Sequence, residues 1–66
     1  MLTLVVNDVP RHSDAETVAQ LLGELTVPPR GVAVALNGEL VRRAEWSERR
    51  LSDGDRLEVL TAAQGG

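Results

Sequence analysis

The chain has 66 residues and carries seven arginines, no lysine and ten acidic residues, which gives a net charge of −3. A chain of this length forms one small domain, and its negative charge argues against general attraction to nucleic acid. It has no cysteine and one histidine, His12, so disulfides, a thiolate nucleophile and the usual metal-ligand sets are excluded. Small domains without disulfides are typical of reducing compartments, and no segment has the pattern of a signal peptide or a membrane span. We therefore expect a cytoplasmic protein that binds neither membrane nor metal.

Alternating apolar residues predict a first strand over residues 2–6 with one strongly apolar face. Turn-forming residues follow at 7–10, and a short return strand is expected to begin at 11–12. The beginning of the chain therefore predicts a hairpin.

The sequence from Ser13 to Glu16 has the spacing of a capping box and predicts a helix that starts near Asp14 and runs to about residue 25. Branched apolar residues recur in it at helical spacing and form one stripe, which must cover a sheet. Gly23 inside this helix costs about 1 kcal/mol relative to alanine, so the helix depends on packing. The stripe consists of Val18, Leu21, Leu22 and Leu25.

A second hairpin is predicted after the helix. Residues 28–31 cannot continue a helix, and alternation over 32–36 indicates a strand. Asn37-Gly38 suits a two-residue hairpin turn because both central residues need a positive φ angle. Residues 39–41 then form the short return strand.

The rest of the domain contains one irregular connection and a last strand. Residues 42–50 are expected to be irregular or to form a single helical turn, with Trp46 and Leu51 as core anchors. Residues 52–55 form a turn, and alternation from residue 57 predicts the final strand.

This order of elements predicts an α+β domain over residues 1–61, followed by a flexible tail over 62–66. The rules for crossover handedness and short connections favour a mixed sheet of four to five strands with one main helix on one face and the first and last strands as parallel neighbours. This is the ubiquitin-like β-grasp arrangement. The predicted core consists of Leu2, Leu4, Val6, Val18, Leu21, Leu22, Leu25, Val32, Val34, Leu36, Val41, Leu51, Leu57 and Val59, with Trp46 at its edge.

The last residues, Gly65 and Gly66, are the most informative feature. Without Cβ atoms, they can enter a narrow channel and adopt backbone angles that other residues resist. Together with Ala63 and Gln64, they form a flexible tail that can reach a partner's active site while the folded body stays outside. A carboxylate such as that of Gly66 would become electrophilic if ATP converted it to an acyl-adenylate, and sulfur transfer could then give a thiocarboxylate.

Three parts of the chain are informative together. They are Val34-Ala35-Leu36-Asn37-Gly38-Glu39-Leu40-Val41, then Trp46 with Leu51-Ser52-Asp53-Gly54-Asp55-Arg56-Leu57-Glu58-Val59, and finally Gly65-Gly66. With them the chain resembles the ThiS family, the bacterial sulfur carriers of thiamine thiazole synthesis, over essentially its whole length. The resemblance implies that Gly66 is adenylated by an E1-like, ThiF-like enzyme that uses ATP, while the carrier itself binds no cofactor and is not an enzyme. It also implies a sulfur donor such as a cysteine desulfurase, and a ThiG-like thiazole synthase that receives the sulfur.

A carrier also needs a docking surface. Leu60 falls on the face of its strand opposite the core residues, and Val5, Ala33 and Ala35 have the matching parity in their strands. We expect these four residues to form an open apolar face that docks the adenylating enzyme, with Arg56 and Glu58 around it.

Other polar residues favour structural interpretations. Asp53 and Asp55 lack the remaining ligands of a calcium loop and indicate an Asx-stabilised turn. His12 is expected to be a solvated residue at a strand edge. The arginines of residues 42–50 alternate with glutamates and indicate a solvated, ion-paired face.

Three alternatives stay open at this point. A carrier resembling the small subunit of molybdopterin synthase would use the same terminal chemistry with another acceptor. A non-covalent ubiquitin-like interaction module would not use its Gly-Gly end, and a protein tag would attach to other proteins through Gly66. In each case, we expect a monomer when no partner is bound.

Overall fold

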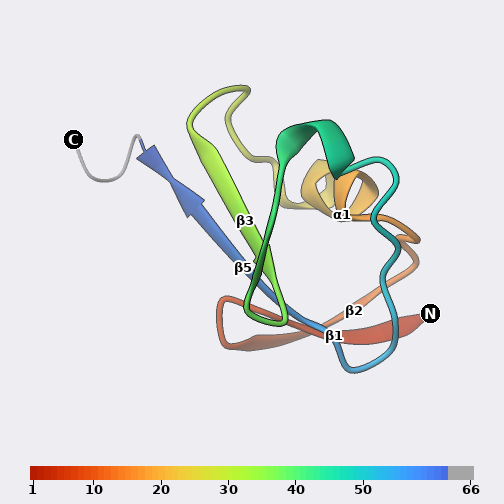
Figure 1. The fold of residues 1–66 in the computed structure, drawn as a ribbon. Helices are drawn as coiled ribbons and strands as arrows, with labels where there is room; N and C mark the ends of the chain where they lie inside the picture. The colour runs from red at the N-terminus through yellow and green to blue at the C-terminus, as the bar shows by residue number, and fades with distance from the viewer. Residues whose placement is uncertain (63–66) are drawn as a thin grey trace.

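The computed structural model describes residues 1–62, and Figure 1 shows their fold as one helix lying against a curved sheet. No helix within these residues is long and apolar enough to cross a membrane. The elements are β1 (Leu2–Val6), β2 (Val9–Ser13), α1 (Val18–Leu25), β3 (Val32–Leu36), β4 (Glu39–Val41), the 3₁₀ turn η1 (Arg43–Glu45) and β5 (Arg56–Thr61).

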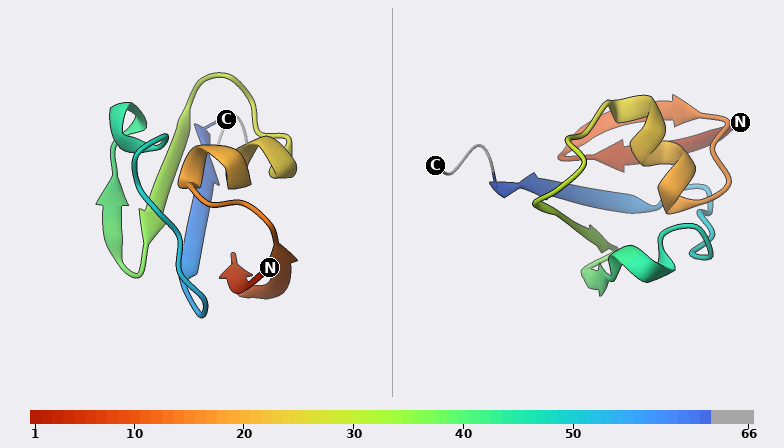
Figure 2. Two further views of the ribbon diagram at one scale, coloured as in Figure 1. Left: turned by 90° about the vertical axis from the view of Figure 1, so that its right-hand side faces the viewer. Right: turned by 90° about the horizontal axis from the view of Figure 1, so that it is seen from above.

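The sheet has the strand order β2-β1-β5-β3-β4. β1 and β5 are parallel neighbours at its centre, and the other pairings are antiparallel. The views in Figure 2 show α1 on one face of this sheet. The predicted mixed sheet with one helix is therefore confirmed.

The helix begins later than the capping-box pattern predicts. α1 starts at Val18, and its N-cap is Thr17, whose hydroxyl accepts a hydrogen bond from the Gln20 amide at 3.2 Å. Ser13 instead ends β2, where it pairs with Leu2. The predicted start near Asp14 was wrong because strand pairing holds the chain extended through Ser13.

Both hairpins turn through left-handed backbone. Asn7 and Asp8 have φ angles of 50° and 67°, and Asn37 and Gly38 have φ angles of 51° and 86°. Positive φ at both central residues is the requirement of a two-residue turn that matches strand twist. The first turn is therefore shorter than residues 7–10, and β2 already begins at Val9.

The core lies between α1 and the inner face of the sheet. The predicted apolar set occupies it, with Leu2, Leu25, Val32 and Trp46 only partly buried at its margin. Ala15 also belongs to the core, although the sequence pattern did not predict it. It is 5% exposed because the chain between β2 and α1 crosses the end of the core. The most deeply buried side chains are those of Leu4, Val18, Leu21, Val34, Leu36 and Leu57.

Candidate functional site

Strand β5 connects the core to the end of the chain. Leu57 and Val59 point into the core, whereas Glu58 and Leu60 are exposed on the outer face of the sheet. β5 ends at Thr61, and the amide of Ala62 donates a hydrogen bond to the Gly31 carbonyl at 2.6 Å. The predicted tail residues Ala63, Gln64, Gly65 and Gly66 lie outside the described residues.

The outer face carries a shallow hollow of about 280 Å³ over β3, β4 and β5, bordered by Asn7 and Asp8 of the turn between β1 and β2. Ala33 and Ala35 line it with small side chains. Leu60 and Leu40 also line it, and each is 70% exposed. Such large apolar side chains gathered on one open face are typical of an interaction surface.

Three of the four predicted docking residues line this hollow together, namely Leu60, Ala33 and Ala35. Val5 does not line it. It is half-buried on β1, opposite Pro10 and Arg56. Leu40 was missed by the sequence reasoning, although the two-residue turn at Asn37-Gly38 places it opposite Ala35 and could have identified it.

A side-chain clamp holds the part of β5 that leads to the tail. β1 pairs with β5 only as far as Leu57. Beyond that point, the Asn7 amide nitrogen donates to the Val59 carbonyl at 3.1 Å, and the Asn7 amide oxygen accepts from the Val59 amide at 2.8 Å. Asn7 thereby continues the strand pairing after the backbone of β1 has turned away.

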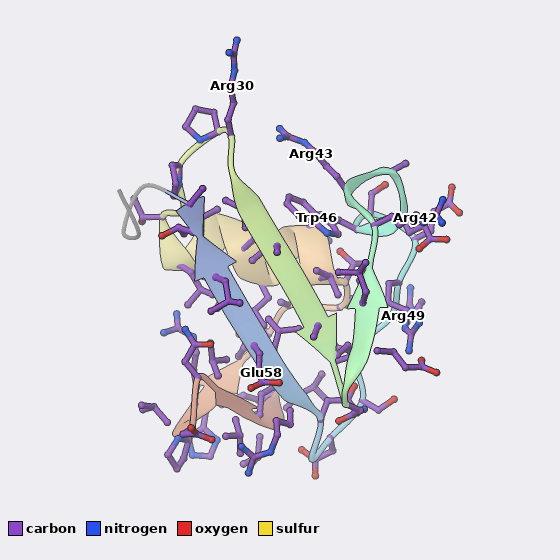
Figure 3. The ribbon with its side chains drawn as sticks, turned by 60° about the vertical axis from the view of Figure 1, so that its left-hand side comes forward. Arg30, Arg42, Arg43, Trp46, Arg49 and Glu58 are labelled. Atoms are coloured by element: carbon purple, nitrogen blue, oxygen red, sulfur yellow. The ribbon has the colours of Figure 1, made fainter. Side chains whose placement is uncertain are left out.

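The arginine-rich connection is mainly structural. The guanidinium of Arg43 lies 5.6 Å from the centre of the Trp46 ring and donates to the Pro29 carbonyl at 2.7 Å. Arg49 pairs with Glu39 on β4 at 3.3 Å, and not with a glutamate of its own segment. Figure 3 shows these side chains around the β4 side of the sheet.

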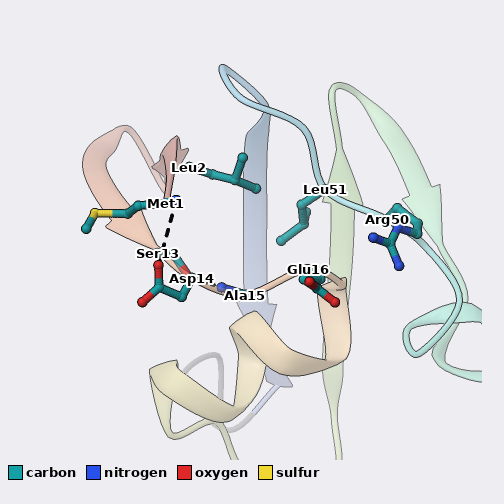
Figure 4. A pocket seen from close by; sticks show the side chains of 8 residues that line it. All are labelled: Met1, Leu2, Ser13, Asp14, Ala15, Glu16, Arg50 and Leu51. Carbon is teal, nitrogen blue, oxygen red and sulfur yellow. Dashed lines mark hydrogen bonds and ion pairs between the residues drawn. The ribbon is translucent and has the colours of Figure 1, made fainter.

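A second hollow, of about 260 Å³, lies where the chain enters the helix (Figure 4). It is lined by Asp14, Glu16 and Arg50 among others, and the amino group of Met1 lies 3.8 Å from Asp14. It adjoins the start of β1, whereas Leu60 and Thr61 lie at the far end of the parallel strand β5. It shares no lining residue with the outer-face hollow.

The remaining polar residues have structural partners. Asp55 accepts a hydrogen bond from the Ser52 amide at 2.8 Å, and Asp53 accepts from the Thr3 amide at 2.6 Å. His12 is exposed at the edge strand and lies 3.3 Å from the Thr3 hydroxyl. Within residues 1–62 there is no cluster of side chains suited to hold a metal ion.

Within residues 1–62, the order of strands, the one α-helix across the sheet and the central position of β5 define a ubiquitin-like β-grasp protein. A crystal structure of the thiamine biosynthesis protein ThiS from Geobacter metallireducens superposes with a TM-score of 0.80 at 38% identity, over 91% of this chain and 93% of that one. The sulfur carrier protein ThiS of Thermus thermophilus is 41% identical over 92% of this chain and 95% of its own length.

A thiazole synthase of Paramagnetospirillum magneticum is also 41% identical over 98% of this chain, which spans only 20% of the length of that protein. The model of the ThiS family matches residues 4–66. The chain belongs to the ThiS family.

Proposed function

We propose that this chain is a sulfur carrier for the thiazole ring of thiamine. The observation that carries the proposal is a family match running through residue 66, together with similarity along nearly the full length of a protein named sulfur carrier. The described residues contribute a folded domain with an exposed apolar face beside the end of β5.

The reactive group of the proposal is the carboxylate of Gly66. Its oxygen attacks the α-phosphorus of ATP on an adenylating enzyme, pyrophosphate leaves, and an acyl-adenylate forms. Sulfide then attacks the acyl carbon and AMP leaves, which converts the carboxylate to a thiocarboxylate without oxidation or reduction. Gly65 beside it places no Cβ in the way of an enclosing active site.

The proposal implies three partners. An E1-like adenylating enzyme activates the carboxylate. A protein such as a cysteine desulfurase supplies the sulfur as a persulfide, which a thiol reduces to sulfide with formation of a disulfide, and a thiazole synthase consumes the carried sulfur. The similarity of this chain to a segment of a protein named thiazole synthase supports the last of these. We place the activity in the cytoplasm, with the carrier as a monomer between encounters.

We further propose that the adenylating enzyme docks on the outer face of the sheet around Leu60. Leu60 lies only two residues before Ala62, so a partner seated on it is close to the point where the tail leaves the folded body. The hollow beside it offers apolar area that the monomer leaves exposed.

Mass spectrometry of the intact protein tests the function. Incubation with ATP, sulfide and the cognate adenylating enzyme should raise the mass by the difference between sulfur and oxygen, and deletion of Gly66 should abolish the change. An unchanged mass of the intact chain with an enzyme that adenylates another carrier would contradict the proposal. Deletion of the gene should cause a requirement for thiamine; a loss of molybdopterin instead would assign the sulfur to another acceptor.

A further inference from the structure

Two carboxylates line the outer-face hollow, those of Asp8 and Glu58, and Asp8 is paired with Arg56. In the register of the sheet, Glu58 on β5 lies opposite Ala35 on β3, and Ala35 lies opposite Leu40 on β4. Directly opposite residues on one face of a sheet are neighbours. A carboxylate, a methyl group and a leucine side chain therefore stand in one row across three strands, with Leu60 two residues further along β5.

The Glu58 carboxylate forms none of the ion pairs within residues 1–62. Arg56 precedes it by two residues on the same face, but its guanidinium donates to Asp8 at 2.5 Å. In Figure 3, Glu58 lies over β5, while Arg30 and Arg43 extend at the opposite end of the sheet. Among the described residues, the Asp8 carboxylate of the hollow is therefore compensated by Arg56, whereas the Glu58 carboxylate has no ion-pair partner.

This charge restricts what can cover the surface. A partner that contacts both Leu40 and Leu60 must also cover the protein surface between these side chains, and that surface includes Glu58. A purely apolar partner would remove the carboxylate from water without compensation, and such burial is strongly unfavourable. A positive side chain in the partner removes this penalty.

The small residues of the hollow show where such a side chain fits. Ala33 and Ala35 leave room between the flanking leucines, and long basic side chains pack their aliphatic part on apolar surface while the charged end meets a polar group. Exclusion of water by the leucines lowers the local dielectric and strengthens the ion pair.

We propose that this hollow receives an arginine or lysine side chain of the adenylating partner, with its aliphatic part over Ala33 and Ala35 and its charge paired with Glu58. This inference rests on the proposed function and names the feature by which the carrier selects its partner. Apolar contact at Leu40 and Leu60 provides area, and Glu58 provides discrimination.

The test measures adenylation by pyrophosphate release with the cognate adenylating enzyme, comparing Glu58→Lys with Glu48→Lys. Both changes alter the net charge equally, and Glu48 is exposed in the connection between β4 and β5, outside the hollow. Glu58→Lys should lower kcat/KM by about tenfold or more, mainly through KM, because like charges meet in the interface. Glu48→Lys should change kcat/KM by less than about twofold, as expected of a solvated surface charge.

If Glu58→Lys unfolds the domain, a milder substitution at the same residue still tests the proposal. Glu58→Gln keeps the shape of the side chain, and it should weaken the salt dependence of kcat/KM as well as raising KM. Equal salt dependence in Glu58→Gln and the unaltered protein would overturn the proposal.

Leu60→Asp separates the possible failures. In one outcome, Leu60→Asp impairs adenylation while Glu58→Lys and Glu48→Lys have the same effect as each other. This result would support docking on the outer face and would overturn the proposal that a basic side chain of the partner pairs with Glu58. If Leu60→Asp has no effect although deletion of Gly66 still abolishes the product, docking occurs elsewhere and both statements about this face fall. A change in self-association of the free chain by Glu58→Lys would make a second copy the occupant and would also overturn the proposal.

Discussion

At the scale of single residues, Asn7 has two separable roles. Its φ angle of 50° lies in the left-handed region, which asparagine tolerates better than most residues. Its side chain also makes both hydrogen bonds of the clamp on Val59. The same residue therefore closes the first turn and fastens the strand that leads to the tail.

Asn7→Ala should lower the free energy of unfolding by about 2 kcal/mol, because it combines left-handed strain with the loss of two hydrogen bonds. Asn7→Gly relieves the strain and removes only the clamp, so it should cost about 1 kcal/mol. Urea titration followed by the fluorescence of Trp46 measures both losses. The Val59 amide should also exchange with solvent faster in each variant. Unaltered exchange at Val59 would show that the clamp contributes nothing.

At the scale of elements, α1 is a short helix that contains an unnecessary glycine. Gly23 is exposed, and a Cβ built on it has no heavy atom within 4 Å. Gly23→Ala should therefore raise the free energy of unfolding by about 0.5 to 1 kcal/mol through helix propensity alone. Thermal unfolding by circular dichroism measures the gain.

Gly54→Ala is the matched control for this prediction. Gly54 also has open space around its Cβ position, but its φ angle is 87°. The same added methyl group should destabilise the protein there because an L side chain is strained at that angle. Stabilisation by both changes would mean that backbone conformation is not the deciding factor.

The boundaries of the elements show what sequence can specify. Alternation over 32–36 and the Asn37-Gly38 turn locate β3 correctly, since both signals depend only on neighbours in sequence. The start of α1 was misplaced because the Ser13 hydroxyl, which suits a helix cap, donates instead to Glu24 at 2.9 Å and accepts from the Ala15 amide. That choice depends on β2 pairing with β1, which no local pattern contains.

The sequence likewise predicts some features of the candidate site and not others. Strand parity sufficed to place Ala33, Ala35 and Leu60 on one face, because side chains alternate strictly along a strand. Parity could not show that Arg56 pairs with Asp8, and that Glu58 therefore has no ion-pair partner among the described residues, since Asp8 comes from the first turn of the chain. The unpaired charge of Glu58 could be identified only from the assembled sheet.

At the scale of the whole molecule, a domain of 66 residues has little stability to spare, about 3 to 10 kcal/mol in total at usual values per residue. Some of its leucines are buried in the core, whereas others are exposed on the surface. Leu57 is 1% exposed in the core, whereas Leu40 is 70% exposed beside the hollow. The free energy of unfolding should therefore depend strongly on Leu57 and very little on Leu40.

Leu57→Ala should cost about 2 to 5 kcal/mol, because it removes buried apolar area and leaves a cavity that the strand pairs on both sides of β5 prevent from closing. Leu40→Ala should change the free energy of unfolding by less than about 0.5 kcal/mol, as is usual for exposed positions. Urea titration through Trp46 fluorescence compares the two, since Trp46 packs at the core margin and its indole nitrogen donates to the Val41 carbonyl at 3.0 Å. If Leu40→Ala proved as costly as Leu57→Ala, Leu40 would belong to the fold, and the hollow could not be a surface held open for a partner.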